Sequence, residues 1–203
     1  MIISMSDILC VTNRTLCRED FLKRVEKIAA NHPKGIILRE KDLTEEAYKR
    51  LAEDVMSLCK KYETPCTLHS FADAAIELGA ESIHLPLHIL RELDEEKKQK
   101  FKTIGASCHS VAEAQEAERL GCTYITAGHV FVTDCKKGLA PRGLDFLKGV
   151  VESVSIPVYA IGGISSENIG AVRKAGAKGA CIMSGLMRCE DVEEFLKDFE
   201  MNV

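Results

Sequence analysis

The segment 156–186 reads IPVYAIGGISSENIGAVRKAGAKGACIMSGL and carries the clearest structural signal in the chain. Two short runs of apolar and β-branched residues, Val158–Ile161 and Gly179–Met183, have the length and composition of buried strands. Between them lies a stretch long enough for a helix, which Gly176 is placed to end. The order strand, helix, strand predicts a parallel βαβ unit, with small residues directly after each strand.

The same alternation continues toward the start of the chain. Apolar residues recur at helical spacing over residues 21–29, 47–59 and 192–199. Ser110 with Glu113 has the spacing of a capping box that opens another helix. Six further runs have the character of strands: Asp7–Thr12, Gly35–Leu38, Pro65–Leu68, Ser82–Leu85, Thr103–Ala106 and Thr123–Ala127.

Eight strand candidates that alternate with helices predict an α/β fold, a (β/α)8 TIM barrel formed by residues 1–203 as a single domain. With 203 residues the chain is shorter than the ~250 typical of such barrels, so short loops are expected. A doubly wound open sheet is the alternative. That fold usually carries G-x-G-x-x-G after its first strand, and residues 11–14 contain no glycine.

Composition narrows the classes of function. The chain is 46% hydrophobic, and its net charge of −4 gives no basic surface for a nucleic acid or an anionic membrane. No apolar run reaches the ~20 residues of a membrane span, and the first ten residues lack the features of a signal peptide. Nine cysteines, an odd number with no C-x-x-C spacing, favour reduced thiols. We expect a cytoplasmic protein without nucleic-acid or membrane partners.

In a barrel of this kind, functional residues lie at the carboxyl ends of the strands, and the loops after the last two strands often hold a phosphate group. Gly162 and Gly163 follow the seventh predicted strand, and Ser184 and Gly185 follow the eighth. Small residues let backbone N–H groups approach an anion closely. Glycines that serve only a tight turn are the alternative explanation. Because both loops occur where the fold places them, the sequence predicts a phosphorylated small molecule as ligand.

A long loop after the sixth strand carries further candidates. His129 would stand just past the strand end, where an imidazole with an ordinary pKa near ~6.5 can exchange a proton at neutral pH. Lys136 and Lys137 follow in the same loop and are candidates to neutralise an anionic substrate, or are two solvated lysines. The sequence does not show which of the two lysines reaches inward.

Two other strand ends add polar groups. Arg39 and Lys41 follow the second strand two residues apart, so they should point the same way, and a guanidinium suits a carboxylate or a phosphate. Ser107 after the fifth strand is a candidate hydroxyl donor to the pocket. His109 beside it fits a capping or packing role equally well.

Two pairs of residues contain the residue types of a nucleophilic or a metal site, but their positions in the sequence argue against such sites. Cys108 and His109 are adjacent, and neighbouring residues of an extended segment face opposite sides, so they make a poor nucleophile and base. His84 and His88 have the i, i+4 spacing of metal ligands, but Pro86 lies between them and interrupts a helix. We expect no metal site.

Several stretches together resemble the thiamine phosphate synthase and TenI superfamily in order and along nearly the whole chain. They are ILREKD at 37–42, SIHLP at 82–86, IGASCHS at 104–110, YITAGHVFVTDCKKGL at 124–139, IPVYAIGGI at 156–164 and CIMSGL at 181–186.

The departures from the synthase pattern decide which branch the chain resembles. The synthase usually has Asn-Asp at the end of the third strand, where this chain has His69-Ser70, and an acidic residue soon after the fourth, where it has 86–88 Pro-Leu-His. Two oxygen ligands for Mg²⁺ are therefore missing. The synthase also usually has Gly-Pro where this chain has Gly128-His129, and threonine in place of Cys135.

The loop GHVF-x-TDCKKGL resembles instead the TenI branch, whose thiazole tautomerase uses a histidine at this place for acid–base chemistry. The resemblance implies that His129 is catalytic, that Thr133, Lys136 and Lys137 bind substrate with Arg39, Lys41 and Ser107, and that Gly162, Gly163, Ser184 and Gly185 hold the phosphate. The implied substrate is the carboxylated 5-ylidene thiazole ethyl phosphate, isomerised to the aromatic thiazole carboxylate phosphate. No cofactor is implied, and a homodimer is expected from the resemblance.

Two other functions remain open at this stage. One is a thiamine phosphate synthase, a transferase that joins hydroxymethylpyrimidine diphosphate to thiazole phosphate and holds Mg²⁺ by other means. The other is a regulatory protein that binds a phosphorylated metabolite without turnover. His69, where the synthase has asparagine, either contacts the substrate or packs in the core.

Overall fold

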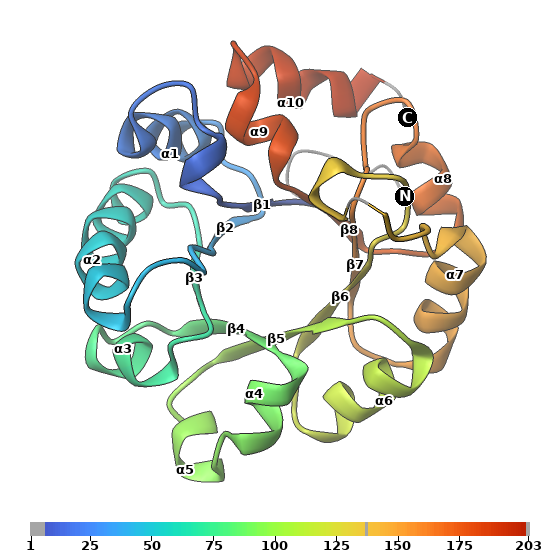
Figure 1. Cartoon of the computed structure of the whole chain (residues 1–203), viewed down its shortest axis with the longest axis horizontal. Coiled ribbons are helices and arrows are strands. Elements are labelled where there is room, and N and C mark those ends of the chain that lie inside the picture. The colour runs from blue at the N-terminus through green and yellow to red at the C-terminus, as the bar shows by residue number, and fades with distance from the viewer. Residues whose placement is uncertain (1–6, 137, 202–203) are drawn as a thin grey trace.

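Eight parallel strands close into a barrel in the computed structural model, which describes residues 7–136 and 138–201 (Figure 1). Their order around the barrel is the order in the chain, and β1 pairs with both β2 and β8. This pairing confirms the predicted (β/α)8 fold and excludes the open sheet. The strands are β1 Ile8–Val11, β2 Gly35–Leu38, β3 Cys66–His69, β4 Ser82–Pro86, β5 Thr103–Cys108, β6 Tyr124–Gly128, β7 Val158–Ile161 and β8 Gly179–Ile182.

Helices form a ring around the outside of the barrel (Figure 1). Ten α-helices and two short 3₁₀ helices are assigned in the described part of the chain: α1 Phe21–Ala30, α2 Glu45–Lys61, α3 Ala72–Glu77, α4 Leu87–Glu92, α5 Glu95–Lys98, α6 Val111–Arg119, α7 Gly143–Ser153, α8 Ile169–Lys174, α9 Ser184–Arg188, α10 Val192–Met201, η2 Arg14–Leu16 and η3 Asp134–Lys136. No helix among the described residues is both long enough and apolar enough to cross a membrane.

The predicted capping box at the start of α6 is half correct. Ser110 is the N-cap, and its hydroxyl accepts a hydrogen bond of 3.1 Å from the backbone N–H of Glu113. The Glu113 carboxylate does not return to Ser110 but accepts the backbone N–H of His109, one residue earlier, at 2.5 Å. The carboxylate thereby fixes the end of β5 against the first turn of α6.

Side chains alternate between the two faces of each strand, as the pleat requires. Outward residues such as Ile36 and Leu38 on β2 join the main core between the barrel and the helices. Inward residues form a smaller apolar cluster of Leu9, Val11, Ile37, Tyr124, Tyr159 and Cys181. Polar inward side chains on β3 to β6, among them His69, His84, Ser107 and Thr126, form the floor of the site described next.

Candidate active site

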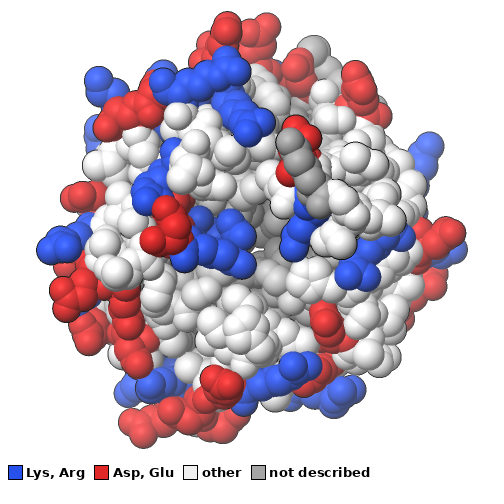
Figure 2. Space-filling model, in the orientation of Figure 1, with Lys and Arg blue, Asp and Glu red and all other residues white. Residues whose placement is uncertain are grey.

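A pocket of about 480 Å³ opens at the carboxyl ends of the strands. Residues from all eight strands or from the loops that follow them line it, so its position is the one expected for an active site in this fold. Figure 2 shows Lys and Arg side chains on two sides of the hollow at the centre of this face. The structure therefore brings the predicted site residues that it describes to one place.

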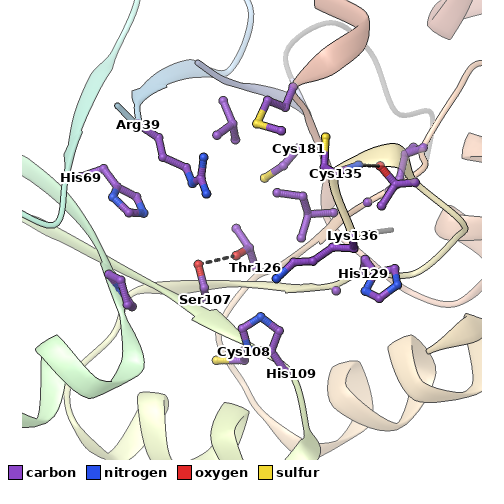
Figure 3. A pocket seen from close by; sticks show the side chains of 18 of the residues that line it. Arg39, His69, Ser107, Cys108, His109, Thr126, His129, Cys135, Lys136 and Cys181 are labelled. Atoms are coloured by element: carbon purple, nitrogen blue, oxygen red, sulfur yellow. Dashed lines mark hydrogen bonds between the residues drawn. The ribbon is translucent and has the colours of Figure 1, made fainter. Parts of the chain in front are cut away.

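Four positive side chains among the described residues line this pocket, and one of them, Arg91, is paired with Glu116. The other three, Arg39, Lys41 and Lys136, are called the cationic wall below. Burial lowers the pKa of Arg39, and burial together with repulsion from Arg39 and Lys136 lowers the pKa of Lys41. Figure 3 shows Lys136 reaching toward the middle of the pocket from the loop after β6, with Arg39 across from it. Lys137, the other lysine predicted here, lies outside the described residues.

Glu40 lies between Arg39 and Lys41 in the chain but points away from the pocket into a buried setting. Its carboxylate side chain is 1% exposed and accepts a 2.7 Å hydrogen bond from the Thr12 hydroxyl. It also accepts the backbone N–H of Arg14 at 3.0 and 3.1 Å. The loops after β1 and β2 are thus joined through one carboxylate, which the sequence analysis did not identify.

His129 directly follows β6 and lines the pocket, as predicted. The side chain is largely buried, and Nε2 lies 3.3 Å from the backbone carbonyl oxygen of Leu139 in the same loop. Because a carbonyl oxygen only accepts, Nε2 carries the hydrogen, and in the neutral ring Nδ1 then holds the lone pair. Nδ1 has no hydrogen-bond partner among the described residues.

Gly162 and Gly163 follow β7 and have positive φ angles of 99° and 67°. A Cβ atom on Gly162 would collide with the Cα and Cβ of His129, and one on Gly163 would collide with Val132 and Phe131. The absence of side chains here therefore permits the loop after β6 to pack against the loop after β7. The glycines position His129, which is a role that the sequence analysis missed.

The loops after β7 and β8 are compatible with the phosphate-binding role predicted for them. Among the described residues, no hydrogen-bond acceptor is found for the backbone N–H groups of Gly163 and Ile164, and both residues line the pocket. Ser184 and Gly185 open the short helix α9 and also line the pocket. A Cβ on Gly185 would meet the ring of Phe195 on α10, so this glycine has a packing role as well.

The floor of the pocket is polar but built from neutral groups. His84 on β4 lies 2.9 Å from both the Tyr124 hydroxyl, through Nδ1, and the Ser107 hydroxyl, through Nε2. Burial lowers the pKa of His84 to about 3, and the pKa of His69 well below its ordinary value, so both rings are neutral at physiological pH. Thr126 lies beside Ser107, as Figure 3 shows.

His69 lines the pocket and is also packed against its neighbours, so the two roles left open by the sequence are combined. Its Nδ1 lies 2.6 Å from the Ser70 hydroxyl, and its ring is stacked 5.7 Å from the ring of His84. Tyr124 was not among the predicted site residues. Its place two residues before Thr126 on the same strand was the available signal, because both then face the barrel interior.

Thr133, the remaining predicted site residue, also lines the pocket, together with two residues considered in the sequence analysis. Thr133 and Cys135 line the pocket from the loop after β6. His109 lines the opposite side, with Nδ1 3.3 Å from the Glu113 carboxylate. Burial raises the pKa of Cys108 to about 12, which agrees with the conclusion that Cys108 and His109 do not form a nucleophilic pair.

The donor set of this pocket does not suit Mg²⁺. Glu113 is the one carboxylate among the described lining residues, and it accepts the backbone N–H of His109. The described residues contain no cluster of three or more His, Cys, Asp or Glu side chains arranged for a metal. Since Mg²⁺ is held in proteins mainly by carboxylates and phosphate oxygens, this chain would have to leave the ion largely to its substrate.

Fold and pocket together define a (β/α)8-barrel protein with a small-molecule site at the carboxyl ends of its strands. A family model described as thiamine monophosphate synthase matches residues 8–186, and the chain belongs to this family.

The named relatives of the chain are consistent with this family. A thiamine-phosphate synthase of Fusobacterium nucleatum is 34% identical over 95% of this chain and 96% of that protein. A putative thiamine-phosphate synthase 2 of Aquifex aeolicus is 36% identical over 83% of this chain and 91% of that protein. The solved structure of a thiamine phosphate pyrophosphorylase from Pyrococcus furiosus has a TM-score of 0.83 at 28% identity, and covers 98% of this chain and 96% of that one.

These names support membership in an enzyme family of thiamine biosynthesis. The relatives are named as synthases, which is the alternative function left open by the sequence, and their names do not distinguish the TenI branch.

Proposed function

We propose that the chain is a thiazole tautomerase, a cofactor-free isomerase of the TenI type within this family. The observation that carries the proposal is the His129 imidazole, which lines the pocket with Nε2–H bonded to the Leu139 carbonyl and Nδ1 free to accept a proton. A proton shift needs a positioned group that can both take and give a proton near neutral pH. Imidazole is the side chain best suited to that work.

The proposed substrate is the carboxylated 5-ylidene thiazole ethyl phosphate. In our assignment the loops after β7 and β8 hold its phosphate through Gly162, Gly163, Ser184 and Gly185. The cationic wall and Thr133 bind the rest of the substrate, with the positive charges facing the carboxylate. Two anionic groups on one small ligand would suit the three side chains of the cationic wall, which form no ion pair with the described residues.

The reaction moves one hydrogen and changes no oxidation state. His129 removes the hydrogen from C2 of the ring, which the adjacent C=N bond and the coming aromaticity make acidic. The electron pair shifts through the π-system, and the imidazolium returns a proton to the exocyclic carbon. Such acid–base catalysis contributes about 10²–10⁴-fold, enough for a reaction that is already downhill.

A second candidate, thiamine phosphate synthase, is favoured by the names of the relatives. The cationic wall would suit a diphosphate, but the single lining carboxylate leaves few protein ligands for Mg²⁺. His69-Ser70 also stand where the synthase pattern has Asn-Asp. We rank this candidate second for these two reasons.

Two assays on the same purified protein separate the candidates. We expect proton NMR to show faster loss of the C2 hydrogen of the ylidene substrate, and no release of diphosphate from the pyrimidine diphosphate, thiazole phosphate and Mg²⁺. Robust diphosphate release would identify the synthase and overturn the proposal. Tight binding of thiazole phosphate without turnover in either assay would identify a regulatory binding protein.

A further inference from the structure

Three polar side chains from β4, β5 and β6 form a continuous hydrogen-bonded chain beneath the pocket. The Tyr124 hydroxyl and His84 Nδ1 are 2.9 Å apart, and His84 Nε2 and Ser107 Oγ are also 2.9 Å apart. Tyr124 and His84 are buried, whereas Ser107 is only partly buried and lines the pocket. The hydrogen-bonded chain therefore runs from the barrel interior to the pocket.

The direction of these hydrogen bonds follows from counting donors. Burial keeps His84 neutral, so its ring has one N–H and one lone pair. The Tyr124 hydroxyl is hydrogen-bonded to His84 and also to the buried Thr67 hydroxyl on β3. Among the described residues, Tyr124 is the one hydrogen-bond partner found for the Thr67 hydroxyl. If Tyr124 accepted from His84, its own hydrogen would go to Thr67, and the buried Thr67 O–H would then have no acceptor among the described residues, which is costly. Tyr124 must therefore donate to Nδ1, and His84 must donate from Nε2 to Ser107.

Ser107 is left with a hydroxyl hydrogen to give. Its oxygen accepts from His84, and Thr126 Oγ1 lies at a longer distance of 3.5 Å as a further donor. With Thr126 as the donor in that contact, no other described residue lies within hydrogen-bond distance to accept the Ser107 O–H. Figure 3 shows Ser107 beside Thr126 in the open part of the pocket, so this hydrogen is available to a ligand.

We infer that Tyr124 and His84 are positioning residues that fix the Ser107 hydroxyl as a hydrogen-bond donor to an acceptor atom of the bound ligand. In this arrangement Tyr124 and His84 do not contact the ligand. Tyr124 orients the His84 ring, and His84 orients the Ser107 hydroxyl. The ligand group over Ser107 is accordingly a neutral or anionic acceptor, such as a ring nitrogen or a carboxylate oxygen, and not a donor. On the proposed function, the thiazole nitrogen or the carboxylate meets this requirement.

The Tyr124 ring in this hydrogen-bonded chain has room only because residue 105 is glycine. Gly105 is the inward residue of β5 two positions before Ser107. A Cβ atom on Gly105 would overlap the ring of Tyr124. Burial also raises the pKa of Tyr124 well above its ordinary value, which keeps the phenol protonated as the donor to His84. The small residue at 105 and the large one at 124 therefore form a matched pair on adjacent strands.

The tautomer of His84 in the ligand-free protein tests the inference without any substrate. We expect ¹⁵N NMR of the histidine rings to show Nε2 protonated and Nδ1 unprotonated, unchanged between pH 8 and pH 5. Tyr124→Phe should shift the ring toward the other tautomer, because the donor to Nδ1 is gone. Protonation at Nδ1 in the wild-type protein would overturn the inference whatever the reaction proves to be.

A double-mutant cycle tests the consequence for the ligand. Ser107→Ala and Tyr124→Phe should each weaken binding of thiazole phosphate or of the carboxylated product about tenfold, and the double variant should be no weaker than Ser107→Ala. Tyr159→Phe is the matched control, because Tyr159 faces the same interior, with its ring 5.8 Å from that of Tyr124, but has no bond to His84. Additive losses, or equal losses in Tyr159→Phe, would contradict the inference.

If neither thiazole ligand binds the wild-type protein at all, the proposed function fails and the NMR result decides the inference alone.

Discussion

The Thr12 hydroxyl donates a 2.7 Å hydrogen bond to the Glu40 carboxylate and accepts the backbone N–H of Arg39 at 2.9 Å. One hydroxyl on β1's loop therefore joins a buried acid to the first residue of the cationic wall. Glu40 faces away from the pocket, but through Thr12 it helps to fix the position of the backbone that carries Arg39 and Lys41.

Glu40→Gln should raise the KM for the phosphorylated substrate about tenfold and destabilise the protein by about 1–3 kcal/mol. The amide NH₂ would face the N–H of Arg14, where the carboxylate now accepts. Steady-state kinetics and urea unfolding measure the two effects. Asp42→Asn is the control, because Asp42 also pairs with Arg14 but is exposed, and there KM and stability should change little. Equal effects in both variants would contradict the positioning role.

Gly162→Ala should lower activity far more than Gly121→Ala. Both glycines have φ above 90°, so both variants carry similar backbone strain of about 1 kcal/mol. A Cβ at 162 meets the backbone and Cβ of His129, whereas a Cβ at 121 meets nothing within 4 Å. Comparing kcat in the two variants at matched folded fractions isolates the displacement of His129. Similar kcat values would show that His129 is not positioned by this glycine.

Stability should fall with acidification between pH 7 and pH 5 because of the buried histidines. His84 has a pKa of about 3 in the folded protein and near 6.5 when unfolded, so the unfolded chain gains a proton that the folded chain refuses. This favours unfolding as pH falls below about 6.5, by about 2 kcal/mol for His84 at pH 5. Burial of His69 acts in the same direction.

Urea unfolding at several pH values measures this effect, and His84→Gln should flatten the dependence. His109→Gln is the control, since His109 lies at the pocket rim and is exposed at 45% of its side chain. An unchanged slope in His84→Gln would show that the ring takes up a proton in the folded state.

Lys136→Met should weaken substrate binding in a salt-dependent manner. Lys136 lies on the described lining of the pocket with the other two residues of the cationic wall, and its removal takes away attraction for an anionic ligand. We expect KM to rise about tenfold at low salt and less at high salt. Lys148→Met, a change at an exposed lysine of α7, should leave KM unaltered. A salt-independent loss would point to a structural effect of the substitution.

The order of elements could be predicted from the sequence because each strand is a short apolar run and each loop after it begins with a distinct residue pattern. The position of His129 followed from the end of β6 in the same way. The packing of Gly162 against His129 could not be predicted, because it joins two loops whose approach depends on the closed barrel. The roles of Glu40 and Tyr124 were missed for a similar reason.

Those two residues show what a one-dimensional pattern omits. In the sequence, Glu40 has the pattern of a surface acid between two basic residues. In the structure, it is buried by its contacts with the loop after β1. Tyr124 looks like an ordinary strand aromatic, and only the register of β5 against β6 brings Gly105 opposite it. His84 was considered as a metal ligand and set aside, and the structure instead shows it between two hydroxyl groups.

The most direct test of the proposed chemistry follows the C2 hydrogen of the ylidene thiazole carboxylate phosphate by proton NMR with wild-type protein, His129→Ala and His109→Ala. We predict that His129→Ala loses about 10²–10⁴-fold in rate while its affinity for thiazole phosphate stays nearly the same, and that His109→Ala keeps most of the wild-type rate. Full activity in His129→Ala would contradict the assignment of this imidazole as the group that moves the proton.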